Sequence, residues 1–145
     1  MGSKGASADA AILSVIALGG GIGAVARYGV SLWVPQTGDI PWQTLAVNMI
    51  GCFAIGVLMV CITEIWSAHR LLRPFLGVGV LGGFTTFSTF AVEVRRLLES
   101  SRTVYAGLGY LGGTVVVSLA AVVLGVSVTR WLSGTVRRGL GAGDE

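Results

Sequence analysis

The fold depends most on the segment Gly77-Val-Gly-Val-Leu-Gly-Gly-Phe-Thr-Thr-Phe-Ser-Thr-Phe90, in which glycines come first and hydroxyl side chains then alternate with aromatic ones. The segment lies within an uncharged run, Pro74–Val92, of about the length that crosses a membrane as a helix. Its paired glycines and threonines are poor helix formers, and irregular backbone at membrane depth is tolerated only in a protein interior or beside a wet cavity. The segment therefore predicts a membrane helix that breaks near its middle, where freed carbonyls and amides commonly form ion sites.

The alternative for this segment is an unbroken helix whose glycines serve helix packing. Gly79 and Gly83 stand four positions apart, a small-xxx-small pair of the kind that lets two membrane helices approach closely. The break is favoured because the poor helix formers are grouped in the middle of the run.

Three more uncharged runs surround this one, and the composition agrees with a membrane protein. Of 145 residues, 53% are hydrophobic and 12% are charged, about half the roughly 25% of charged residues in soluble domains. The sequence predicts an all-α integral membrane protein with four transmembrane helices in one domain, residues 10–132, between a disordered leader (1–9) and a flexible C-terminal tail (133–145). The four runs are Ala10–Ala26, Ile40–Thr63, Pro74–Val92 and Thr103–Thr129.

The ends of the predicted helices carry tryptophans and prolines. Tryptophan prefers the membrane–water interface, and a proline at the first helical position loses no hydrogen bond within the helix. These residues support the boundaries independently of hydropathy: Trp33, Trp42, Trp66, Trp131, Pro41 and Pro74.

Basic residues form no patch that would suit a nucleic acid. The ten lysines and arginines sit singly or in pairs beside the hydrophobic runs, as headgroup-facing flanks do. Near the spans they divide almost evenly between the two sides of the membrane, so the positive-inside rule does not choose an orientation. The chain is therefore expected to insert both ways and to pair as an antiparallel dimer. The alternative is that Lys4, Arg137 and Arg138 in the tails fix one orientation.

Several polar residues inside or at the ends of the runs are candidates for an ion path. The amide of Asn48 either bonds a neighbouring helix or donates to a passing anion. Tyr110, Thr114 and Ser118 are spaced i, i+4 and i+8 on one helix face, and their hydroxyls form a polar track or bond their own i−4 carbonyls. Arg27 ends the first run and either snorkels to the headgroups or supplies positive potential at a water-filled mouth.

Other chemistries receive little support from the sequence. Glu64 and Glu93 flank the second and third runs, so no carboxylate is expected well inside a span, where a proton-coupled exporter normally has one. His69 is the only histidine and lies in a loop, which argues against a histidine-based metal or catalytic site. No activating base is apparent beside a serine nucleophile. The chain is not expected to be an enzyme.

Three motifs form a recognisable set: Gly19-Gly-Gly-Ile-Gly-Ala-Val-Ala-Arg27-Tyr28, Thr44-Leu-Ala-Val-Asn48-Met-Ile-Gly51 and Gly82-Gly-Phe-Thr-Thr-Phe-Ser-Thr-Phe90. Together they resemble the CrcB/Fluc family of fluoride channels, and the third motif is highly specific. The resemblance covers all four helices, roughly Ile12 to Leu132. It implies an antiparallel, dual-topology homodimer with two separate fluoride pores in the cell membrane.

The resemblance also implies roles for individual residues. A structural sodium ion at the dimer centre would be held by the backbone carbonyls of Gly82 and Thr85. Arg27 would lie at an aqueous vestibule. The implied pore residues are Phe87, Phe90, Asn48, Tyr110, Thr114 and Ser118.

The expected function is passive export of cytoplasmic fluoride, which reduces its toxicity. An inside-negative potential favours anion exit by about 2.3 kcal/mol per 100 mV, so neither an ATP site nor a coupling residue is required. The expected partners are fluoride, sodium, the lipid bilayer and a second copy of the chain. Two alternatives are a small multidrug exporter and a non-conducting structural subunit that needs a sister chain.

Overall fold

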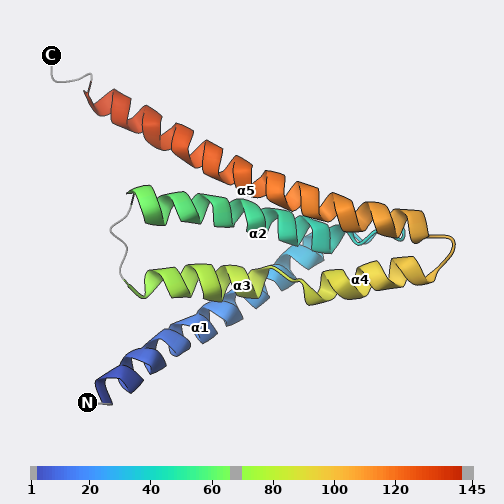
Figure 1. The fold of residues 1–145 in the computed structure, drawn as a ribbon, viewed down its shortest axis with the longest axis horizontal. Coiled ribbons are helices and arrows are strands. Elements are labelled where there is room, and N and C mark those ends of the chain that lie inside the picture. Colours follow the sequence, from blue (N-terminus) through green and yellow to red (C-terminus); the bar gives the residue numbers. More distant parts are fainter. Residues whose placement is uncertain (1–2, 66–69, 142–145) are drawn as a thin grey trace.

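A computed structural model describes the backbone of residues 3–65 and 70–141, and within these ranges every regular element is helical (Figure 1). Two short segments, η1 and η2, are π-helical turns that continue or begin a longer helix. In chain order the elements are α1 (Ser3–Trp33), α2 (Trp42–Val60), η1 (Cys61–Ile65), η2 (Pro74–Val80), α3 (Leu81–Phe84), α4 (Ser88–Glu99) and α5 (Val104–Gly141).

Four segments are long and apolar enough to cross a membrane: Asp9–Trp33, Trp42–Ile65, Pro74–Glu99 and Val104–Gly134. This confirms the prediction of an all-α chain with four membrane helices. The helices run further into both tails than predicted, because α1 begins at Ser3 and α5 ends at Gly141. Of the residues discussed from the sequence, Trp66 and His69 lie outside the described ranges.

The start of α1 and the end of α5 lie at one end of the bundle, and the turn between α4 and α5 lies at the other (Figure 1). The long helices α2 and α5 lie side by side, whereas α1 crosses η2 and α3. This arrangement follows from an even number of spans joined by short connections.

Glycines make the crossing of α1 with η2 and α3 close. A Cβ atom on Gly79 would lie 2.9 Å from the carbonyl oxygen of Ile16, and one on Gly19 would lie 3.0 Å from the Cα of Gly79. Gly23 and Gly83 have similarly little room against the facing backbone. Gly79 and Gly83 of the third span therefore serve helix packing, as their small-xxx-small spacing suggests.

A second glycine contact joins α2 to α5. A Cβ atom on Gly56 would lie 3.0 Å from the amide nitrogen of Val126 and 3.2 Å from the Cα of Gly125. Because small residues let helix backbones approach in lipid, this contact holds α2 against the middle of α5.

The third span leaves helical geometry after the glycines. Helix α3 continues through Gly82 and Gly83 and ends at Phe84. Thr85 is extended, with φ −74° and ψ 157°, and α4 begins at Ser88. The hydroxyl of Thr86 accepts a hydrogen bond from the Thr89 amide at 3.2 Å. The Thr86 hydroxyl thus accepts a hydrogen bond from one of the backbone amides at the start of α4 that have no partner within the helix.

Large apolar side chains are exposed along the spans. Val25 and Leu18 of α1 are 72% and 66% exposed, and Val116 of α5 is 66% exposed. Water is an unfavourable neighbour for so much apolar surface, so these faces suit lipid or another protein surface. The distribution agrees with a membrane protein whose interior is small.

Candidate functional site

The candidate site is built around residues 85–87, where the third span is not helical. Asn48 of α2 fixes this segment through two hydrogen bonds with the backbone of Thr86. Its Nδ2 donates to the Thr86 carbonyl at 3.0 Å, and its Oδ1 accepts from the Thr86 amide at 2.9 Å. The Asn48 amide therefore replaces a backbone partner. Of the two interpretations left open by the sequence, the hydrogen bond to a neighbouring span is present in the structure, and Nδ2 keeps a second hydrogen for another acceptor.

This pairing removes the helical donors of two carbonyls. In a continuous helix the Thr86 amide would donate to Gly82 and the Thr89 amide to Thr85. Here the Thr86 amide donates to Asn48, and the Thr89 amide donates to the Thr86 hydroxyl. The carbonyls of Gly82 and Thr85 thus lack those i+4 donors. They are the two carbonyls that the family resemblance assigns to a cation.

Arg27 reaches this segment from α1. Its Nη1 donates to the Thr85 carbonyl over a long 3.4 Å. The guanidinium therefore points toward the non-helical segment rather than away from the bundle. It brings a positive charge beside the backbone that Asn48 holds.

A cavity of about 330 Å³ lies between α2, α4 and α5 beside this segment. The structure brings together there five of the six residues expected in the pore: Asn48, Phe87, Phe90, Thr114 and Ser118. The sixth, Tyr110, stands next to the cavity, because its ring packs against Phe90 with centroids 5.5 Å apart.

The hydroxyl of Thr114 is the clearest sign that this cavity takes a polar guest. Thr114 is only 5% exposed, and its Oγ1 makes no hydrogen bond of regular geometry with any residue described in the structure, although the Tyr110 hydroxyl lies close enough to interact with it. A buried hydroxyl without a regular hydrogen bond costs roughly 1–3 kcal/mol. An anion or water molecule in the cavity would remove that cost by accepting its hydrogen.

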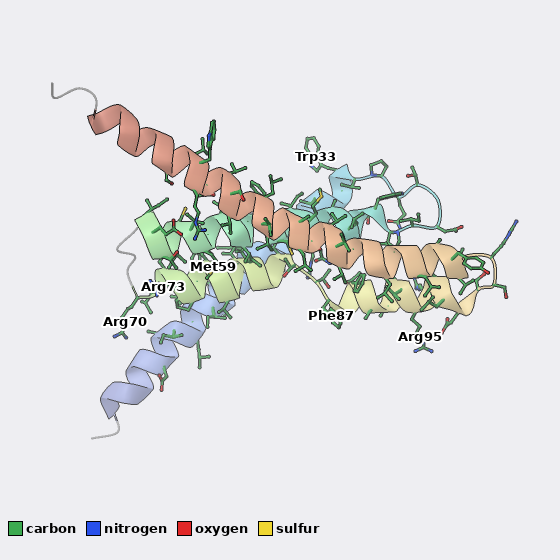
Figure 2. The ribbon with its side chains drawn as sticks, turned by 45° about the horizontal axis from the view of Figure 1, so that its top comes forward. Trp33, Met59, Arg70, Arg73, Phe87 and Arg95 are labelled. Carbon is green, nitrogen blue, oxygen red and sulfur yellow. The ribbon has the colours of Figure 1, made fainter. Side chains whose placement is uncertain are left out.

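The two phenylalanines differ in their surroundings. Phe90 is 7% exposed and packs on Tyr110, whereas Phe87 is 80% exposed. Figure 2 shows Phe87 at the junction of α3 and α4, directed away from the bundle. The ring centroids are 6.0 Å apart and the rings are tilted by 50°. One ring thus belongs to the interior of this chain and the other faces outward.

Glu93 is a site residue that the sequence interpretation missed. Helix α4 continues to Glu99, so Glu93 lies within the third membrane-capable segment and not beyond it. One of its carboxylate oxygens accepts from the Thr44 hydroxyl at 2.8 Å and the other from the Tyr110 hydroxyl at 3.0 Å. The sequence placed Glu93 at the flank of the third run, whereas it lies within the membrane-capable segment, near the end of that segment. Its spacing of i+3 from Phe90 on a helix was the available signal.

Two further cavities continue from the first one, of which one adjoins it and the other adjoins the second. A cavity of about 300 Å³ is lined by Arg27, Thr44, Thr86 and Glu93 among others, so Thr86 borders both this cavity and the first. A third cavity of about 330 Å³, near the α4–α5 turn, shares Glu93 with the second. Polar side chains therefore border a series of hollows from α5 past the non-helical segment to the end of α4.

Comparisons with known proteins agree on one family. Residues 14–126 match the family model described as CrcB-like protein, Camphor Resistance (CrcB). A protein of Nocardia farcinica named "Fluoride-specific ion channel FluC 2" is 60% identical over 131 residues, covering 90% of this chain and 93% of the relative. One of Streptomyces coelicolor, "Fluoride-specific ion channel FluC 1", is 54% identical and is covered over 79% of its length. One of Chloroflexus aurantiacus, "Fluoride-specific ion channel FluC", is 44% identical and 95% covered.

Proposed function

The chain belongs to the CrcB family, and on that premise we propose that it is a fluoride-selective passive channel that releases cytoplasmic fluoride across the cell membrane. The observation that carries the proposal is the cavity beside residues 85–87. It combines two phenylalanine rings, an amide and a buried hydroxyl without a regular hydrogen bond. This set of donors suits a small anion that is a strong hydrogen-bond acceptor. The chain is therefore a multi-pass membrane transporter and not an enzyme.

The cavity offers weak, distributed contacts. Phenyl rings carry a positive edge, and hydroxyl and amide hydrogens replace part of an anion's hydration shell. No lysine or arginine lines this cavity, which keeps fluoride from being trapped, because conduction requires binding weak enough for exit. Arg27 lines the adjoining cavity, where its charge raises the local anion concentration.

The proposed channel is an antiparallel, dual-topology homodimer with two pores. Phe87 supports this arrangement, because its large ring is 80% exposed although its neighbour Phe90 is buried. A second copy that covers Phe87 would bring one aromatic ring of each chain to a shared path. The near-even division of basic residues between the two sides allows both orientations.

The third span is proposed to break at mid-membrane and to help hold a sodium ion at the dimer centre. The donor set fits a hard cation, since the Gly82 and Thr85 carbonyls lack their i+4 donors and backbone carbonyls coordinate Na⁺ in membrane proteins. Two chains would contribute four such oxygens. When bound, the ion would hold the two protomers together, and Arg27 would share the Thr85 carbonyl with it.

One observation favours a second candidate, a small proton-coupled exporter. Glu93 is a carboxylate within a membrane-capable segment, and such groups often relay protons. Both of its oxygens, however, already accept hydrogen bonds from hydroxyls. The relatives' names and the cavity both favour fluoride conduction.

The proposal is tested by measuring fluoride release from potassium fluoride-loaded liposomes that contain only this purified chain. Valinomycin is present so that potassium can leave as well, and liposomes loaded with potassium chloride are the control. Selective fluoride release is expected. If folded, monodisperse protein released no fluoride, the chain would instead be a subunit that needs a sister chain. Release of a cationic drug in exchange for protons would support the exporter.

A further inference from the structure

The cavity that holds Thr114 and Ser118 has one more lining residue with its own chemistry, Cys52. It stands four positions after Asn48 on α2, so the two side chains lie on the same helix face, one turn apart. Its thiol is free and partly buried. Neither the motifs nor the family resemblance assigns this residue a role.

We propose that Cys52 lines the anion path, and that covalent modification of its thiol by a small reagent closes that path. The inference rests on the proposed channel function. A cysteine alone would not support it. The independent observation is the Thr114 hydroxyl, which is buried, borders the same cavity and makes no hydrogen bond of regular geometry with the described residues. A guest that satisfies this hydroxyl passes within the cavity that Cys52 also lines.

The chain contains a matched control in Cys61. It is also free and partly buried, and it is the only other cysteine. It lines a different cavity, which is formed by apolar residues of α2, η2 and α3 such as Phe53, Leu76 and Leu81. Modifying Cys61 therefore adds bulk away from the donors that would hold an anion.

A suitable probe is methyl methanethiosulfonate, which is small, neutral and membrane-permeant. The thiolate of Cys52 attacks the methylthio sulfur, and the reagent's S–S bond breaks. A Cys52–S–S–CH₃ disulfide forms and methanesulfinate leaves, while the thiol proton passes to water. The cysteine sulfur is oxidised and the sulfonyl sulfur is reduced. Dithiothreitol reverses the modification.

The experiment measures fluoride efflux from potassium fluoride-loaded proteoliposomes in the presence of valinomycin, before and after this reagent, and compares each protein with its own untreated rate. The fluoride flux of wild-type protein and of Cys61→Ser is expected to fall by roughly tenfold or more, because the added group fills a path sized for a small ion. Dithiothreitol should restore the flux. Cys52→Ser should keep its own rate.

A labelling measurement keeps the proposal testable if Cys52→Ser conducts poorly. Mass spectrometry follows the rate at which each cysteine of the wild-type protein acquires the methylthio group. Fluoride, but not an equal concentration of chloride, should slow labelling of Cys52 and leave Cys61 unchanged.

Three results would overturn the proposal. They are full flux from protein whose Cys52 is completely labelled, equal block of Cys52→Ser, and a Cys52 labelling rate that fluoride does not alter. Failure of the proposed channel function is a separate result, because it appears as absent efflux before any reagent is added.

Discussion

At the scale of single residues, the site works through side chains that hold backbone in an unusual shape. Asn48 bonds both polar groups of Thr86, and Thr86 in turn bonds the Thr89 amide. These contacts stabilise residues 85–87 outside a helix. Asn48 and Thr86 also line the cavity of the proposed ion path, so both can have a structural role and a role in that path.

The two phenylalanines should separate structural effects from effects on flux. Phe87→Ile is expected to lower fluoride flux by roughly tenfold or more because a ring edge is lost, while the thermal stability of the protomer in detergent stays unchanged, since Phe87 is 80% exposed. Phe90→Ile should lower flux and also destabilise the fold by about 1–2 kcal/mol, because its ring packs on Tyr110. Val92→Ile, another exposed position of α4, is the control. Wild-type flux in both phenylalanine variants would contradict the hypothesis that the ring edges of Phe87 and Phe90 contact fluoride.

Asn48→Asp is expected to suppress conduction and to weaken the fold. The aspartate can still accept from the Thr86 amide, but it cannot donate to the Thr86 carbonyl and adds charge beside it. A buried group left without its partner costs about 1–3 kcal/mol, and the negative charge repels the anion. The measurements are fluoride efflux and melting temperature, with uncharged Asn48→Ala as the comparison. Normal efflux through Asn48→Asp would place this residue outside the path.

At the scale of secondary-structure elements, close glycine contacts and one carboxylate determine how the spans meet. Glycines place α1 directly against the backbone of η2 and α3, and Gly56 places α2 against α5. Glu93 then joins three elements, because it lies on α4 and accepts from Thr44 of α2 and Tyr110 of α5. The site is thus formed by long-range contacts between elements that each fold locally.

Gly23 and Gly21 offer a matched test of the helix contact. A Cβ on Gly23 would clash with the backbone of Val80 and Gly83, whereas one on Gly21 would meet nothing within 4 Å. Gly23→Ala should therefore destabilise the protein by about 1–3 kcal/mol or more, and Gly21→Ala should leave its stability nearly unchanged. The melting temperatures of both variants are measured by thermal unfolding in detergent. Equal melting temperatures would contradict the observed crossing of α1 with α3.

Glu93→Ala should be more harmful to stability than Glu93→Gln. Removal of the carboxylate leaves the hydroxyls of Thr44 and Tyr110, each 5% exposed, without their acceptor, at a cost of about 1–3 kcal/mol for each unpaired group. Glutamine keeps an acceptor and much of the shape. Glu99→Ala is the control, because its only described ion pair, with Arg95, is exposed. Equal stability of the Glu93 variants and the wild type would contradict this role.

The elements were predictable from the sequence because hydropathy and glycine spacing are local signals. The same signals placed the end of the third span too early, and Glu93 was therefore assigned to a flank although α4 reaches Glu99. The partners of Glu93 lie 49 and 17 positions away in the chain. No periodic pattern links such residues, so the carboxylate's role depends on the assembled fold. The two hydrogen bonds between the Asn48 side chain and the Thr86 backbone could not be predicted for the same reason.

At the scale of the whole molecule, the proposed channel consists of two copies in opposite orientations. This arrangement explains the balanced basic residues and the exposed Phe87 ring. It also explains why the cavities lie at the surface of one protomer, where a second copy can complete them.

Dual insertion can be measured with Ser101→Cys in the turn between α4 and α5. About half of the molecules should react with a membrane-impermeant maleimide in intact spheroplasts, because the balanced flanks do not select an orientation. Detergent-permeabilised spheroplasts give the total, and the parent chain, whose own cysteines are partly buried, gives the background. Labelling of nearly all or nearly none would show that the tail charges fix one topology.

The proposed function requires that fluoride crosses the membrane through this chain alone, passively and as a charged ion. It is tested most directly by following fluoride efflux from proteoliposomes loaded with potassium fluoride, first without and then with valinomycin. A passive anion path builds up an opposing potential and stalls, and it runs freely only when potassium can leave as well. Almost no fluoride release is expected before valinomycin is added and rapid release after it, with no comparable release of chloride. Equal release in both conditions, or none in either from folded protein, would contradict the proposed function.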